Sequence, residues 1–177
     1  IFPVLPEKYR GIPCTDYKDD LIIPGLTDLH VHAPQYTFRA SGMDLELLDW
    51  LNTYTFPQEA RYEDPEFAKE AYSIFAEDMK KSPNTRACIF GTLHVPATEI
   101  LMEQLDKTGI KAMVGKVNMD RNGSPQLQEE SAQASADATV QWIKDTLDKF
   151  ENVKPILTPR FTPSCSDELM EKLSEIQ

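Results

Sequence analysis

Short apolar runs alternate with longer amphipathic segments along most of this chain. Four of the runs have the length and composition of buried strands, and each is followed by a segment with helical spacing. The predicted strands cover residues 21–31, 86–93, 111–117 and 154–159. The predicted helices cover residues 44–53, 64–81, 98–107 and 129–150, with a last helix beginning near Ser166. This alternation predicts an α/β fold with a parallel sheet and helices packed outside it.

Local signals mark several of these helix ends. Asp64 and Pro65 fit the N-cap and the first position of a helix, and Gly109 fits the residue just beyond a helix end. Ile74 lies on the apolar face predicted for residues 64–81, and Leu147 lies on that predicted for residues 129–150. We therefore expect both side chains to face the core.

Two architectures fit this order of elements. One is a four-stranded open sheet, and the other is part of a (β/α)8 barrel, which typically needs about 250 residues. Residues 21–177 suffice for about four β/α units rather than eight. The sequence begins without methionine and stops inside a predicted helix, so we expect it to be part of a longer protein.

Composition narrows the function classes. The formal net charge of -11 argues against nucleic acid as a general partner, since phosphate binding needs clustered lysine and arginine. The three cysteines, Cys14, Cys88 and Cys165, form no closely spaced pair, which favours a reducing, cytoplasmic compartment. We find no apolar run approaching the roughly 20 residues of a transmembrane helix, and no signal peptide, so we expect no membrane partner.

His30 and His32 are two of only three histidines and follow an apolar run. Residues i and i+2 of a strand point to the same face, so both imidazoles are expected to project together from the end of the strand. Two imidazoles on one face suit zinc, and catalytic zinc sites keep one position open for water. The alternative is that each histidine is satisfied by a backbone carbonyl, and the spacing alone does not exclude it.

The surrounding residues extend this pattern to P-G-x-x-D-x-H-x-H over residues 24–32. This pattern resembles the first-strand metal signature of the amidohydrolase superfamily. The segments H-A-P-Q-Y at 32–36, Y-T-F-P at 54–57, V-G-K-V-N-M-D at 114–120 and T-P-R-F at 158–161 are similar to the guanine deaminase family within it. The similarity extends from about residue 21 to the end of the chain.

The resemblance implies a distorted (β/α)8 TIM-barrel-like hydrolase fold, with about its first four β/α units in residues 21–177. Residues 1–20 would be the remnant of a small N-terminal β domain. The implied activity is the zinc-dependent hydrolysis of guanine to xanthine and ammonia, a step of purine catabolism. One Zn2+ would be bound by His30 and His32.

The resemblance also implies a substrate site formed by four residues of this chain. His32 and Gln35 would contact guanine, Arg160 would hold it, and Phe161 would stack against it. An arginine fork and a glutamine amide suit a purine edge, and an aromatic ring suits its flat face. Taken without the resemblance, Arg160 fits a surface ion pair and Phe161 fits the core.

Other expected parts of such a site are absent from this sequence. The family's remaining metal ligands and its acid/base glutamate and aspartate are expected downstream of residue 177, so no catalytic residue is assigned here, and this segment alone is expected to be inactive. His94 and Lys116 are not assigned as ligands. Homodimerisation is expected of the full-length protein. The alternatives are another aminopurine, pyrimidine or triazine deaminase of the superfamily, or an inactive half-barrel that only self-associates.

Overall fold

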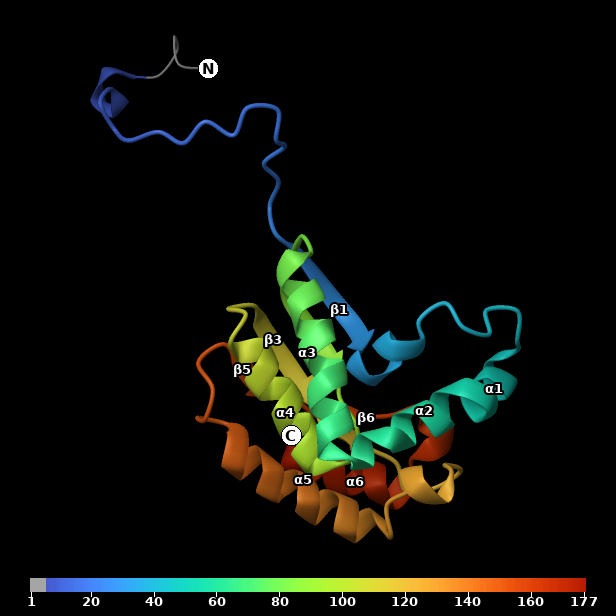
Figure 1. The fold of residues 1–177 in the computed structure, drawn as a ribbon. Coiled ribbons are helices and arrows are strands. Elements are labelled where there is room, and N and C mark those ends of the chain that lie inside the picture. Colours follow the sequence, from blue (N-terminus) through green and yellow to red (C-terminus); the bar gives the residue numbers. More distant parts are fainter. Residues whose placement is uncertain (1–5) are drawn as a thin grey trace.

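The fold is built on a parallel sheet. The computed structural model describes residues 6–177. Its four-stranded sheet comprises β1 (Leu26–His32), β2 (Asn84–Phe90), β3 (Lys111–Gly115) and β5 (Val153–Pro155) (Figure 1). Two further short strands, β4 (Val117–Asn118) and β6 (Thr158–Pro159), pair in parallel with each other beyond the ends of β3 and β5.

The strands lie in the sheet in the same order as in the sequence. The order is β1-β2-β3-β5, and every neighbouring pair is parallel. A doubly wound sheet reverses its strand order at a switch point, whereas a (β/α)8 barrel adds each strand beside the previous one. The observed order is that of consecutive barrel units.

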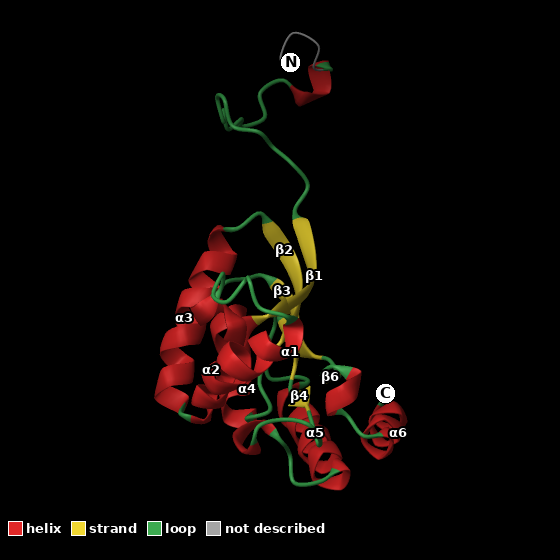
Figure 2. Ribbon diagram, turned by 90° about the vertical axis from the view of Figure 1, so that its right-hand side faces the viewer, coloured by secondary structure: helices red, strands yellow, loops and turns green. Residues whose placement is uncertain are grey.

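Helices cover one face of this sheet. They are α3 (Pro65–Lys81), α4 (Val95–Asp106) and α5 (Ala132–Thr146), and α6 (Asp167–Ile176) packs against α5. Figure 2 shows α3 and α4 packed along one side of the strands. Ala87 and Ile89 of β2 are buried in this layer, whereas Cys88 points the other way and lines a groove with the exposed Met113 of β3. The second face therefore corresponds to the inside of a barrel.

The helix-end signals read from the sequence are confirmed. The Asp64 carboxylate accepts a hydrogen bond from the Glu66 backbone N–H at 3.0 Å, and the Ser166 hydroxyl oxygen accepts one from the Leu169 N–H at 3.1 Å. Gly109 follows α4 with φ of +79°, a conformation that only glycine adopts without strain. These caps define where α3 and α6 begin.

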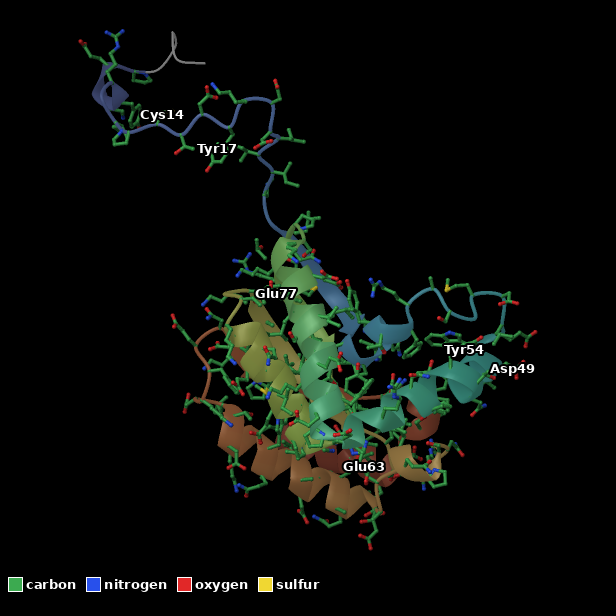
Figure 3. The ribbon with its side chains drawn as sticks, in the orientation of Figure 1. Cys14, Tyr17, Asp49, Tyr54, Glu63 and Glu77 are labelled. Atoms are coloured by element: carbon green, nitrogen blue, oxygen red, sulfur yellow. The ribbon has the colours of Figure 1, made fainter. Side chains whose placement is uncertain are left out.

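The strand predicted at residues 21–31 begins later, because Leu21, Ile22 and Ile23 are exposed and have no strand to pair with. The structure instead carries residues 6–25 away from the sheet, with one short 3-10 turn at Glu7–Tyr9 (Figure 1). Cys14 and Tyr17 lie on this extended segment (Figure 3). The proposed domain division at residue 20 stays a prediction.

The helix predicted at 44–53 was placed too early and made too short. Helical structure begins with α1 (Leu47–Trp50), passes through a π-helical turn at Leu51–Thr55, and continues through α2 (Phe56–Ala60) to a 3-10 turn at Arg61–Glu63. Pro57 does not end it: the proline lies in α2 directly after the π-helical turn, and the helical path continues through it.

Two core positions were predicted wrongly. Ile74 and Leu147 are exposed, and Tyr72 and Trp142 occupy the buried faces of α3 and α5 instead. The buried face of α5 also includes Ser135 and Thr139, whose hydroxyls lie 2.8 Å from the side-chain amide of the buried Asn118. The spacing of apolar residues does not reveal polar residues that are buried because their side chains are hydrogen-bonded.

Candidate active site

A bulge in β1 sets the direction of the two histidines. Between Asp28 and Val31 the pairing with β2 shifts, so that three steps on β1 oppose two on β2. A bulge leaves one residue outside the ladder and can redirect side chains near active sites. Here the His30 N–H is satisfied by the Asp28 carboxylate at 3.1 Å. Val31 packs on the core, while His30 and His32 face a cavity.

Gly25 explains another part of the sequence pattern. A Cβ at this position would lie 2.2–2.8 Å from the side-chain atoms of Thr85, well inside contact distance. The chain therefore enters β1 beside Thr85 only because residue 25 is glycine. Gly25 and Asp28 precede the histidines in the pattern. Gly25 allows the close approach to Thr85, and Asp28 satisfies the His30 N–H.

The spacing of the histidine pair fits two ligands of one metal ion. The Nε2 atoms of His30 and His32 lie 3.1 Å apart. Two nitrogens bound tetrahedrally to zinc at its usual bond length lie about 3.3 Å apart, so a small adjustment would suffice. Phe90 of β2 stacks on His32 with centroids 4.6 Å apart and also touches His30, which restricts both rings.

The electrostatics also suit metal binding. Burial, together with repulsion from Arg160 and from His30, lowers the pKa of His32 to about 3. His32 is therefore neutral at physiological pH and keeps a nitrogen lone pair available. Within residues 6–177, no group of three or more His, Cys, Asp or Glu side chains is arranged to hold a metal ion.

β6 delivers the residues predicted to hold a substrate. Thr158 and Pro159 pair with β4, and the Arg160 N–H then donates to the Asn118 carbonyl at 3.1 Å. Phe161 follows with φ of +55°, a region that side-chain-bearing residues rarely adopt. Its side chain remains 43% exposed. Strained backbone of this kind often accompanies functional sites.

Glu59 is a site residue that the sequence analysis missed. It lies on α2, is almost completely buried, and forms an ion pair with the buried Arg160. Its other carboxylate oxygen accepts a hydrogen bond from Gln35 Nε2 at 3.1 Å. Gln35 lies in the 3-10 segment Ala33–Phe38 directly after β1. One carboxylate therefore links the end of β1 to the end of β6.

These residues surround one cavity of about 350 Å³. His30, His32, Gln35, Arg160 and Phe161, the five residues singled out from the sequence, all line it. Its remaining walls are mostly apolar and are formed by Leu47, Trp50, Leu51, Phe56, Phe90, Pro159 and Ser164. This combination of apolar walls and a few convergent polar groups is typical of a small-molecule site.

His94 and Lys116 do not line this cavity. His94 occupies the N-cap position of α4, and burial lowers its pKa. Lys116 is buried and pairs with Glu129, which also accepts a hydrogen bond from the Met119 N–H at 3.1 Å. Lys116 thus ties β4 to the loop before α5.

Comparison with known proteins agrees with this geometry. A sequence model described as "Amidohydrolase family" matches residues 21–177. The chain belongs to the amidohydrolase family. The barrel-type strand order is therefore that of part of the amidohydrolase (β/α)8 fold, as expected from the sequence.

Several proteins similar to this chain are guanine deaminases. The chain is 44% identical to guanine deaminase of Rattus norvegicus over 158 residues, which are 89% of this chain and 35% of that protein. It is 35% identical to guanine deaminase of Escherichia coli over 169 residues, covering 94% of this chain and 36% of that protein. The chain thus spans about a third of the length of these curated relatives.

A solved amidohydrolase-family structure gives the same picture. The crystal structure of guanine deaminase from C. acetobutylicum, with guanine bound in its active site, superposes with a TM-score of 0.90 at 48% identity. It matches 97% of this chain and 41% of that one. Separately, no helix among residues 6–177 combines the length and apolar character needed to cross a membrane.

Proposed function

We propose that the full-length protein containing this chain is a zinc-dependent guanine deaminase. Here the full-length protein is this chain extended to the length of its guanine deaminase relatives, of which it spans about a third. The proposed reaction is guanine plus water giving xanthine and ammonia. The observation that carries this proposal is the cavity in which the histidine pair adjoins Gln35, Arg160 and Phe161. The guanine deaminases among the relatives support the choice of substrate.

In this proposal His30 and His32 hold the zinc through their Nε2 atoms. When bound, the metal supplies a water nucleophile at neutral pH. The low pKa of His32 keeps that ring unprotonated, and Phe90 fixes both rings. The mostly apolar walls of the cavity suit the flat faces of the base.

Gln35, Arg160 and Phe161 bind the base. Arg160 has donors that an acceptor on the purine edge can use, and its position is fixed by Glu59. Phe161 presents its ring at the cavity wall and stacks on the flat face of the purine. Orientation of the base by these three side chains places its amino-bearing carbon beside the histidine pair.

Other parts of the proposal lie beyond the described residues. The remaining zinc ligands and the acid/base carboxylates are expected in later barrel strands, so that this segment alone would be inactive. A homodimer, a cytoplasmic location and a role in purine catabolism also stay predictions.

The test is release of ammonia by the purified full-length protein from guanine, adenine and cytosine. We expect turnover of guanine with xanthine as product. The Gln35→Leu variant is expected to lower kcat/KM for guanine about tenfold or more, because it removes a polar contact to the base. Gln128→Leu, at an exposed position outside the cavity, is the matched control. Turnover of cytosine or adenine in preference to guanine would contradict the proposed substrate.

A further inference from the structure

Glu59 contacts both of the polar side chains that face the proposed base. One carboxylate oxygen pairs with Arg160 and the other accepts from Gln35. Glu59 itself does not line the cavity. It lies behind the two residues that do, and it is 1% exposed. Its position therefore suits a role exerted through its neighbours rather than through contact with substrate.

The carboxylate determines which way the Gln35 amide faces. An ionised carboxylate can only accept hydrogen bonds, so the Gln35 group directed at it must be the NH2 donor. The opposite end of the amide, the Oε1 acceptor, is then left for the cavity. Arg160 carries only donors, whatever its surroundings. The cavity wall thus offers an acceptor from Gln35 next to donors from Arg160.

This array matches one kind of purine edge. A 6-oxopurine presents an N–H donor at N1 beside a carbonyl acceptor at C6. A 6-aminopurine presents the reverse, a bare N1 acceptor beside an amino donor. The two oxygens of one carboxylate hold Gln35 and Arg160 side by side, so the pair can address two adjacent atoms of a ring.

We infer that Glu59 is a positioning residue that makes this site select 6-oxopurines over 6-aminopurines, by fixing the Gln35 amide with its oxygen toward the base. This inference rests on the proposed purine-binding function. It adds a specificity determinant outside the set of residues that line the cavity.

The decisive variant is Glu59→Gln. Arg160 still requires an acceptor, so the introduced amide would turn its oxygen to Arg160 and its NH2 to Gln35. Gln35 would then offer its oxygen to that NH2 and turn its own NH2 toward the cavity. A donor would then replace the acceptor opposite N1. This change weakens the binding of hypoxanthine and strengthens the binding of adenine.

The measurement is calorimetric binding of hypoxanthine and adenine to the full-length protein. These two bases differ at N1 and C6. Both lack the 2-amino group that the proposed reaction removes, so the measurement reports binding alone. In the wild type we expect hypoxanthine to bind more tightly. Glu59→Gln is expected to narrow the ratio of the two Kd values by about tenfold or more, the scale of one mismatched buried hydrogen bond.

Three variants separate positioning from a general loss of structure. Glu59→Asp remains acceptor-only and should keep the ratio near the wild-type value, even if both Kd values rise. Glu59→Gln added to Gln35→Leu should leave the ratio of that background unchanged, because position 35 no longer carries an amide that can turn toward the base. Glu63→Gln, at an exposed glutamate four residues along the same helical segment (Figure 3), should change nothing.

If Glu59→Gln weakened the binding of both bases equally, the inference would be overturned, because the result would show a structural role only. Should that variant not fold, hydrogen exchange of the Gln35 NH2 in the base-free wild type decides the question. Slow exchange is expected for an NH2 held against buried Glu59, and fast exchange would overturn the inference. Absence of guanine turnover in a wild type that still prefers hypoxanthine would contradict the proposed reaction and leave this inference standing.

Discussion

Replacement of Glu129 by glutamine leaves a buried lysine without its countercharge. Lys116 is 1% exposed, and its ammonium group donates to Glu129, to the Val117 carbonyl at 3.2 Å and, with the Asn118 amide turned, to the Asn118 side-chain oxygen at 3.3 Å. Loss of one partner from a buried ion pair typically costs about 3–5 kcal/mol. The Glu129 side chain is 10% exposed, which admits some solvent and places the expected cost near 3 kcal/mol.

This cost should depend on pH. Burial lowers the pKa of Lys116 below its ordinary 10.5, and the attraction and hydrogen bond from Glu129 partly offset that shift. Between the folded-state pKa and 10.5 the unfolded chain binds more protons, so the free energy of unfolding rises with pH. Without Glu129 the folded-state pKa falls further. The destabilisation should therefore be largest near neutral pH and shrink toward about pH 9.5.

Urea denaturation of the full-length protein at about pH 7 and about pH 9.5 measures both effects. Glu130→Gln, at the exposed neighbouring position, is the matched control and should cost less than about 0.5 kcal/mol. Addition of Lys116→Met to Glu129→Gln removes the buried charge and should recover much of the loss. A cost below about 1 kcal/mol, or an equal cost at both pH values, would refute the reasoning.

Two further predictions concern the site. Phe161→Gly should leave the free energy of unfolding unchanged or raise it by up to about 1 kcal/mol, because φ of +55° is strained for phenylalanine and its side chain is 43% exposed. The same variant should raise KM for guanine, and a loss of more than about 1 kcal/mol in urea denaturation would contradict the assigned strain. Exhaustive chelation should abolish ammonia release, and added Zn2+ should restore it. Full activity after verified zinc removal would exclude the metal role.

Sequence reasoning found the parts of the fold that rest on local signals. The Asp64–Pro65 start of α3 and the Gly109 end after α4 depend on backbone conformations that few residues favour, and both are confirmed. The five candidate site residues also meet in one cavity. His30 and Arg160 are 130 residues apart, so the chain order alone did not place them together; the resemblance did.

Other features could be recognised only in the folded structure. Glu59 lies between the helices predicted at 44–53 and 64–81, and only its partners Gln35 and Arg160 explain its burial. The exposure of Leu21 to Ile23 follows from the lack of a partner strand, which apolar content cannot reveal. The β1 bulge was also missed, because its signal is the single Asp28 that satisfies the His30 N–H.

The most direct test of the central claim is the position of the metal relative to the base. A crystal structure of the full-length protein with bound guanine or xanthine, with anomalous data across the zinc edge, measures it. We predict a zinc peak at about 2.0–2.1 Å from the Nε2 atoms of both His30 and His32, with the base against Arg160 and Phe161. A zinc peak away from the two histidines, or a base bound outside this cavity, would contradict the account.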